Sequence, residues 1–198
     1  AARFLIASPV LNMGITKNSE VTVMICGLDN SGKSSIVSYL QPTDISKEVI
    51  YITPTCGFAL EKFKKFRYDW SCWDMSGFGR YRHLWNHYYQ YSQGIIFVID
   101  VTDKARIAVA KDELTKVLDH PDVVRNKTPI LVFYNKSDEP SNKKMHMTQV
   151  DKILHLNNTS KLKSRIHITE CSALRGTNID EGLRWLIDTI EMKQENEK

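Results

Sequence analysis

Apolar residues in this chain of 198 residues occur in two kinds of run, short continuous ones and longer ones with helical spacing. Six short runs predict β-strands at residues 21–26, 58–66, 68–73, 95–99, 129–134 and 166–171. Four runs with apolar residues on one face predict helices at residues 36–40, 105–118, 145–156 and 179–192. Only a short turn separates the second and third strands, which indicates an antiparallel hairpin. The whole pattern predicts a three-layer α/β fold, in which helices cover both faces of a mostly parallel six-stranded sheet with one antiparallel edge hairpin.

The two ends of the chain depart from this pattern. Residues 1–19 carry an apolar series interrupted by Pro9, which fits either a short amphipathic segment or a leader without fixed structure. Residues 20–193 are expected to form a single domain, because 198 residues are enough for one well-buried core and do not require two. Residues 194–198 form a charged tail.

Composition narrows the class of protein. Hydrophobic residues make up 42% of the chain and charged residues 25%, which is typical of a soluble globular protein. A net charge of +4 is too small to indicate a nucleic-acid partner, although it is compatible with docking at an anionic membrane. The four cysteines have no paired spacing, and three lie in strand-like runs, which favours reduced core thiols. No run approaches the roughly 18 apolar residues of a membrane span, so we expect a soluble cytoplasmic protein.

Residues 27–34 match the phosphate-binding pattern G-x-x-x-x-G-K-[ST] between a predicted strand and a predicted helix. In such a turn, successive backbone N–H groups and the helix N-terminus point at one anion. The residues expected to contact this anion are Asp29, Asn30, Ser31, Gly32, Lys33, Ser34 and Ser35. Lys33 would reach the β- and γ-phosphates, and the Ser34 hydroxyl would be a ligand of Mg²⁺. An ordinary glycine-containing turn is the alternative, and the context of the motif disfavours it.

Three further polar motifs follow predicted strands. Asp74 begins the sequence Asp-Met-Ser-Gly, and a carboxylate at a strand end can hold a metal-bound water. Asn135, Lys136 and Asp138 follow the fifth strand, and Cys-Ser-Ala at 171–173 follows the sixth. The two carboxylate oxygens of Asp138 suit the N1–H and 2-amino groups of guanine, which adenine does not offer together.

Together with a Pro-Thr pair at 54–55, these motifs resemble the complete ordered set of the Ras-like small GTPases. The resemblance implies a P-loop fold that binds GTP or GDP with Mg²⁺. The metal would be held by Ser34, Thr55 and, through water, Asp74. Guanine would be held by Asn135, Lys136, Asp138, Ser172 and Ala173. Thr55 and the Gly77 amide would contact the γ-phosphate only in the triphosphate state, so hydrolysis would release both switch loops.

The sequences Gly-Leu-Asp-Asn-Ser-Gly-Lys at 27–33, Pro-Thr-Cys-Gly-Phe at 54–58 and Leu-Trp-Asn-His-Tyr-Tyr at 84–89 resemble, within these GTPases, the ADP-ribosylation factor (Arf) and Arf-like branch. The sequences at 57–64, 74–82, 110–114 and 120–122 are most similar to its ciliary subgroup linked to Bardet-Biedl syndrome. Phe58, Trp73 and Tyr88 match the aromatic trio that this branch uses to bind effectors, although each alone could serve core packing. The resemblance implies a free monomer that is acted on by an exchange factor and a GTPase-activating protein. It also implies that residues 1–19 associate with membrane, that a coat or ciliary trafficking complex (BBSome-like) is recruited, and that the protein lies peripherally at a cilium or basal body.

Position 78 departs from this resemblance. Related GTPases carry a glutamine there to orient the attacking water, whereas this chain has Phe78. Of the expected catalytic positions Lys33, Gly77 and 78, the last would be inactive, and intrinsic hydrolysis would be slow. Three alternatives remain: a non-hydrolysing GTP-bound scaffold, another Arf-like vesicle-trafficking GTPase, and a P-loop ATPase or kinase, which the Asn-Lys-x-Asp motif disfavours.

Overall fold

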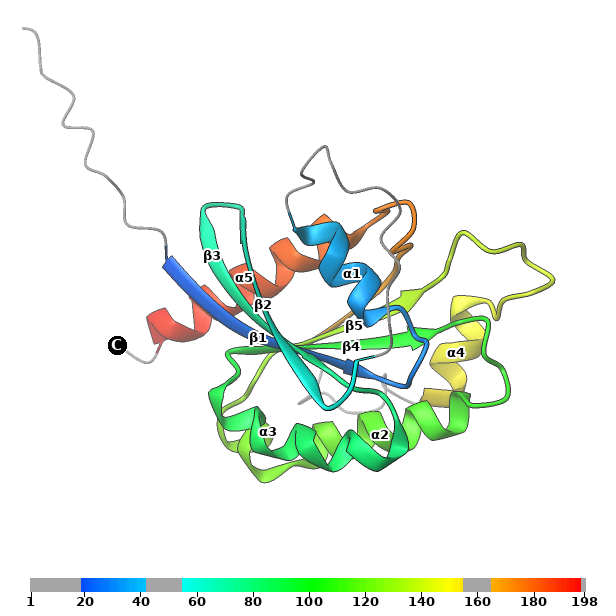
Figure 1. The fold of residues 1–198 in the computed structure, drawn as a ribbon, viewed down its shortest axis with the longest axis horizontal. Helices are drawn as coiled ribbons and strands as arrows, with labels where there is room; N and C mark the ends of the chain where they lie inside the picture. Colours follow the sequence, from blue (N-terminus) through cyan, green and yellow to red (C-terminus); the bar gives the residue numbers. More distant parts are fainter. Residues whose placement is uncertain (1–18, 42–54, 155–164, 197–198) are drawn as a thin grey trace, which may run out of the picture.

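A computed structural model describes residues 19–41, 55–154 and 165–196 (Figure 1). Its centre is a six-stranded sheet in the order β2-β3-β1-β4-β5-β6. The strands are β1 (Ser19–Gly27), β2 (Phe58–Lys65), β3 (Tyr68–Met75), β4 (Gly94–Asp100), β5 (Ile130–Asn135) and β6 (Ile166–Glu170). β2 is antiparallel to β3, and every other neighbouring pair is parallel. The predicted α/β class with an antiparallel edge hairpin is therefore confirmed.

Helices cover both faces of this sheet (Figure 1). They are α1 (Lys33–Leu40), α2 (Ile107–Asp119), α3 (Pro121–Arg125), α4 (Met147–Leu154), α5 (Ile179–Asn196) and the 3₁₀ segments η1 (Gly79–His87) and η2 (Tyr89–Tyr91). Apolar residues of α1 and α5 form one core cluster with one face of the sheet. Those of α2, α3 and α4 form a second cluster on the other face. Each helix buries one apolar stripe against one face of the sheet, so helices on both sides are needed to cover the sheet.

Strand positions match the expectations more closely than helix positions do. All residues of β5, and all but the last of β4, are buried, so their apolar runs are continuous and easily recognised. The first helix begins at Lys33 rather than 36, because its N-cap residue Gly32 already turns the chain with φ 95°. The sequence pattern did not predict α3, η1 and η2. The expected loop at 41–53 lies, beyond residue 41, outside the described residues. So does the segment expected at 1–19, except for its last residue, Ser19, which begins β1.

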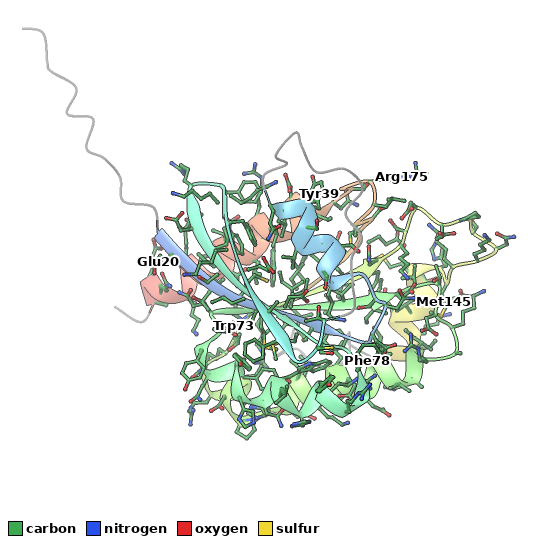
Figure 2. All side chains as sticks on the ribbon, in the orientation of Figure 1. Glu20, Tyr39, Trp73, Phe78, Met145 and Arg175 are labelled. Carbon is green, nitrogen blue, oxygen red and sulfur yellow. The ribbon has the colours of Figure 1, made fainter. Side chains whose placement is uncertain are left out.

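The sheet brings the predicted motifs to one edge. β1, β3, β4, β5 and β6 run in the same direction, so their carboxyl ends meet. Phe78 and Met145 lie near these ends, whereas Glu20 lies at the opposite end of β1 (Figure 2). In an open parallel sheet this edge is where ligands bind.

Candidate functional site

The turn after β1 is shaped by two close approaches of the backbone. Gly27 has φ 137°, and a Cβ atom there would lie 2.2 Å from the carbonyl oxygen of Val98. A Cβ at Gly32 would lie 2.1 Å from Nδ2 of Asn135. Neither position can accept a side chain, so the glycines of the motif are required by this packing.

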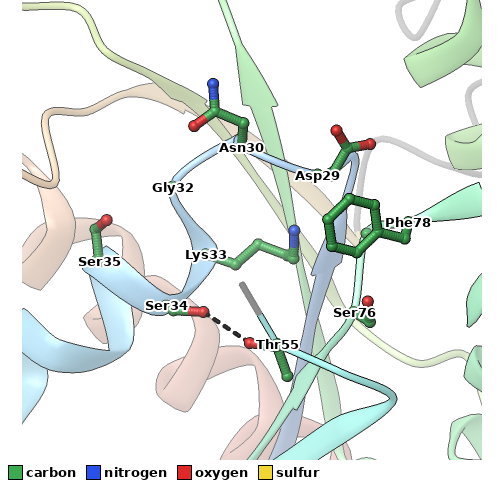
Figure 3. A pocket seen from close by; sticks show the side chains of 10 residues that line it. Asp29, Asn30, Gly32, Lys33, Ser34, Ser35, Thr55, Ser76 and Phe78 are labelled. Atoms are coloured by element: carbon green, nitrogen blue, oxygen red, sulfur yellow. Dashed lines mark hydrogen bonds between the residues drawn. The ribbon is translucent and has the colours of Figure 1, made fainter. Parts of the chain in front are cut away.

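A cavity of about 370 Å³ opens beside this turn and the start of α1 (Figure 3). Its lining consists of Asp29, Asn30, Gly32, Lys33, Ser34, Ser35, Thr55, Ser76, Gly77 and Phe78. All of these except Ser76 were predicted site residues. Ser31 does not line the cavity; its buried side chain faces a small neighbouring void beside Asp100 and Arg106.

Lys33 supplies a buried positive charge to this cavity. Its Nζ donates a hydrogen bond to the carbonyl oxygen of Leu28 at 2.7 Å, and its side chain points toward the cavity (Figure 3). Burial lowers the pKa of Lys33 to about 8, so the amine stays protonated at neutral pH. A buried ammonium beside a helix N-terminus is suited to an anionic ligand.

Three oxygen-bearing side chains meet at one side of the cavity, where two of them, Ser34 and Thr55, line it. The Ser34 hydroxyl donates to Oδ2 of Asp74, and Oγ1 of Thr55 lies 3.2 Å from Oγ of Ser34 and 3.4 Å from the same carboxylate oxygen. Oδ1 of Asp74 is buried and has no hydrogen-bond partner among the described residues. Burial raises the pKa of Asp74. Hard oxygen donors with one unsatisfied carboxylate oxygen fit a divalent cation such as Mg²⁺.

Asn135 connects the turn beside this cavity to the ends of β5 and β6. Its Nδ2 donates to the carbonyl oxygen of Ser31 at 2.8 Å, and its Oδ1 accepts from the Ala173 N–H at 2.9 Å. Asp138 lies in the same loop, where a hydrogen bond with Ser172 lowers its pKa and keeps it ionised. The predicted guanine-binding residues are therefore gathered in one place, beside the cavity rather than within its lining.

Asp100, the last residue of the buried strand β4, was not among the predicted site residues. Its Oδ2 lies 2.6 Å from Nζ of Lys136, and its Oδ1 accepts hydrogen bonds from the N–H and hydroxyl of Thr102. This fixes the position of Lys136 beside the site. The signal was available, because a polar residue directly after a buried strand had already marked Asp74 and Asn135.

Two arginines were also overlooked, and nothing local marks them. Nη1 of Arg106 donates to both carboxylate oxygens of Asp29 at 2.9 Å. Nε of Arg82 donates to the carbonyl oxygen of Gly77 at 2.7 Å, and its Nη2 lies 3.6 Å from Asp29. These side chains tie the turn after β1 to η1 and to the start of α2.

The aromatic trio also comes together. The ring centroids of Trp73 and Tyr88 are 4.8 Å apart. The ring centroid of Phe58 lies 5.6 Å from that of Trp73 and 5.0 Å from that of Tyr88. Phe58 is 44% exposed, so the cluster forms part of the surface rather than of the core. Cys26, Cys72 and Cys171 are buried free thiols as expected, whereas Cys56 is exposed.

No helix among the described residues is long and apolar enough to cross a membrane. The sequence profile of the ADP-ribosylation factor family matches residues 7–190. ADP-ribosylation factor-like protein 6 of Danio rerio is 43% identical over 175 residues, which cover 88% of this chain and 90% of that protein. ADP-ribosylation factor-like protein 1 of Saccharomyces cerevisiae is 36% identical over 178 residues, covering 89% and 91%.

A solved structure gives the same result. The Arl6 BBS3 small GTPase from Trypanosoma brucei, with the bound nucleotide analogue GppNp, superimposes with a TM-score of 0.78 at 32% identity. The match covers 88% of this chain and 99% of that one. The chain therefore belongs to the ADP-ribosylation factor family of small GTPases, whose members bind guanine nucleotides and hydrolyse GTP.

Proposed function

We propose that this GTPase is a Mg²⁺-dependent switch whose phosphates and guanine are bound by the residues gathered around Asn135. The observation that carries the proposal is a pair of hydrogen bonds made by the Asn135 side-chain amide. One goes to Ser31 in the phosphate loop and the other to Ala173 in the loop after β6. Lys33 and the amides of 29–35 bind the phosphates. Asp138, held by Ser172, accepts hydrogen bonds from guanine, and Lys136 lies over the base.

The metal belongs with Ser34, Thr55 and Asp74. When bound, Mg²⁺ neutralises charge on the phosphates and polarises them toward hydrolysis. The Ser34 and Thr55 hydroxyls offer it direct ligands, and Asp74 acts through water. Because Thr55 belongs to the loop before β2, losing its contact to the third phosphate would free this loop. Losing the contact at Gly77 would free the segment after β3 in the same way.

Replacing Asp74 by asparagine is expected to weaken the apparent affinity for Mg²⁺ by about 10- to 100-fold, because a hydrogen-bonded carboxylate that orients metal-bound water is lost. The measurement is the rate of GDP release against free Mg²⁺ concentration. Asp69→Asn is the matched control, since Asp69 lies on the same strand but pairs with exposed Lys64 at 3.3 Å. An Asp74→Asn variant with the Mg²⁺ dependence of the wild type would contradict this assignment.

We propose that intrinsic hydrolysis is slow because Phe78 cannot orient water. Its side chain has neither a donor nor an acceptor, and it occupies the wall of the cavity next to Gly77. Nucleotide binding does not need position 78, so binding and turnover can separate. A non-hydrolysing GTP-bound scaffold is the second candidate. Single-turnover phosphate release with and without cell extract distinguishes the two, since stimulation by extract would exclude the scaffold.

The cellular role proposed here follows from the relatives. Its basis is the similarity to two proteins, ADP-ribosylation factor-like protein 6, matched by sequence, and the Arl6 BBS3 small GTPase, matched by structure. We assign to this chain membrane association in the GTP state and recruitment of a coat or ciliary trafficking complex through Phe58, Trp73, Tyr88 and the switch loops. An exchange factor and a GTPase-activating protein would drive the cycle of the monomer. A role in another vesicle-trafficking step is the alternative within the family.

Membrane association can be tested with vesicles. The chain loaded with GppNp should sediment with vesicles containing anionic lipid to a greater extent than the chain loaded with GDP, because residues 1–18 would be available only in the triphosphate state. A chain lacking residues 1–18 is the control and should stay in the supernatant in both states. Equal sedimentation of the two nucleotide states would contradict the proposed switch at the membrane.

A further inference from the structure

Phe78 occupies a definite place in the cavity. It lies between Gly77 and η1, is half-buried, and shares the cavity wall with Asp29 and Ser76. Its ring points toward the Lys33 amine (Figure 3). If Lys33 marks the position of the terminal phosphates, the ring lies beside the terminal phosphate.

The backbone that carries this ring is held on both sides. On one side, Gly77 packs so closely on the turn after β1 that a Cβ there would lie 2.2 Å from the backbone nitrogen of Asp29. On the other side, the N–H of Tyr81 donates to the carbonyl oxygen of Phe78 at 2.8 Å and closes the first turn of η1.

Arg82 holds the peptide between Gly77 and Phe78. Its Nε donates to the Gly77 carbonyl at 2.7 Å, while Nη1 lies 3.5 Å from Glu113 and Nη2 3.6 Å from Asp29. The Arg82 side chain is only 15% exposed, so these contacts are partly shielded from water. These contacts hold the backbone at residues 77 and 78 beside the cavity, and so keep the point from which the Phe78 side chain enters its wall.

We propose that Phe78 acts as a shutter on the terminal phosphate, so that its ring excludes the attacking water in addition to failing to orient it. This rests on the proposed GTP-binding function. In hydrolysis the water oxygen bonds to the γ-phosphorus, and the bond from that phosphorus to the bridging oxygen breaks with its electron pair left on the β-phosphate. The protons of the water pass to inorganic phosphate and solvent. An apolar ring beside that phosphorus displaces the water from which the reaction starts.

The shutter makes a prediction that the mere absence of glutamine does not. Phe78→Ala removes the ring and supplies no polar group. If the ring excludes water, this variant hydrolyses GTP about 10-fold faster than the wild type in single turnover, and Phe78→Gln hydrolyses it faster still. If only orientation is missing, Phe78→Ala matches the wild type. Phe78→Leu keeps a bulky apolar side chain without donor or acceptor and should remain slow, and Arg80→Ala is a neighbouring control outside the cavity lining.

Nucleotide release supplies a second readout, which a general loosening of the loop would change differently. The ring adjoins only the third phosphate, so Phe78→Ala should release GppNp several-fold faster and GDP at the wild-type rate. Equal acceleration of both nucleotides would overturn the shutter. So would Phe78→Ala hydrolysis at the wild-type rate beside a faster Phe78→Gln, an outcome that leaves the GTP switch intact. Failure of the wild type to bind GTP would instead overturn the proposed function itself.

Discussion

Replacing Asp138 by asparagine is expected to lower the affinity for GDP and GTP by about 100- to 1,000-fold, because a site built on hydrogen bonds rejects a ligand that leaves them unmade. The Asp138 carboxylate is ionised and is hydrogen-bonded to Ser172, so it presents acceptors to the N1–H and 2-amino groups of guanine. In asparagine an NH₂ group replaces one carboxylate oxygen, and this donor would face one of the two guanine donors. The measurement is the equilibrium dissociation constant for a fluorescent GDP.

The same variant should gain affinity for xanthine nucleotides. Xanthine carries a carbonyl where guanine has the 2-amino group, and this carbonyl can accept from the asparagine amide. Asp112→Asn, in an exposed position on α2, is the control and should bind GDP like the wild type. A GDP affinity in Asp138→Asn equal to that of the wild type would remove the support for Asp138 as the guanine acceptor. So would loss of binding to both nucleotides because the variant is unfolded, as measured by circular dichroism.

The second large effect is expected at Lys33. Replacing it by glutamine should lower affinity for GTP and GDP by about 100-fold or more, with GTP affected more strongly, because a buried ammonium that pairs with phosphate is lost. Lys33 is 6% exposed, and its Nζ donates a hydrogen bond to the Leu28 carbonyl. Calorimetric titration with each nucleotide gives the two affinities.

Stability supplies the control for this variant. Burial lowers the pKa of Lys33, which means that its charged form is less stable in the nucleotide-free fold than in water. Lys33→Gln without nucleotide should therefore melt at or above the wild-type temperature, while its melting point rises less on adding GDP. Lys104→Gln, at an exposed position, should match the wild type in both respects. Equal GDP affinity in Lys33→Gln and the wild type would contradict the phosphate role.

The sequence predicted the strands well because burial on both faces leaves continuous apolar runs, as in β5. The segment η1 was missed for the opposite reason. It is rich in basic residues and buries only Trp85, whose Nε1 donates to the carbonyl oxygen of Ser76 at 3.0 Å. One buried residue in nine gives no periodicity. The five-residue helix α3 depends on the His120 cap and on Pro121, and is too short for its pattern to be recognised.

The candidate site divides in a similar way. Its motif residues follow strands of one direction, so the fold class alone predicts that Asp74, Asn135 and Ala173 come together. Arg106 reaches Asp29 across 77 residues of sequence, and Arg82 approaches Asp29 from η1. Such long-range ion pairs depend on the packing of α2 and η1 against the turn after β1. They have no local signature and had to come from the structure.

Competition between nucleotides tests the central claim most directly. Purified chain loaded with fluorescent GDP in Mg²⁺ should release it when GTP is added at comparable concentration, and should retain it against about a 1,000-fold excess of ATP, because only guanine satisfies Asp138. Removing Mg²⁺ with a chelator should speed the release in both cases. Displacement by ATP as effective as displacement by GTP would contradict a guanine-specific switch.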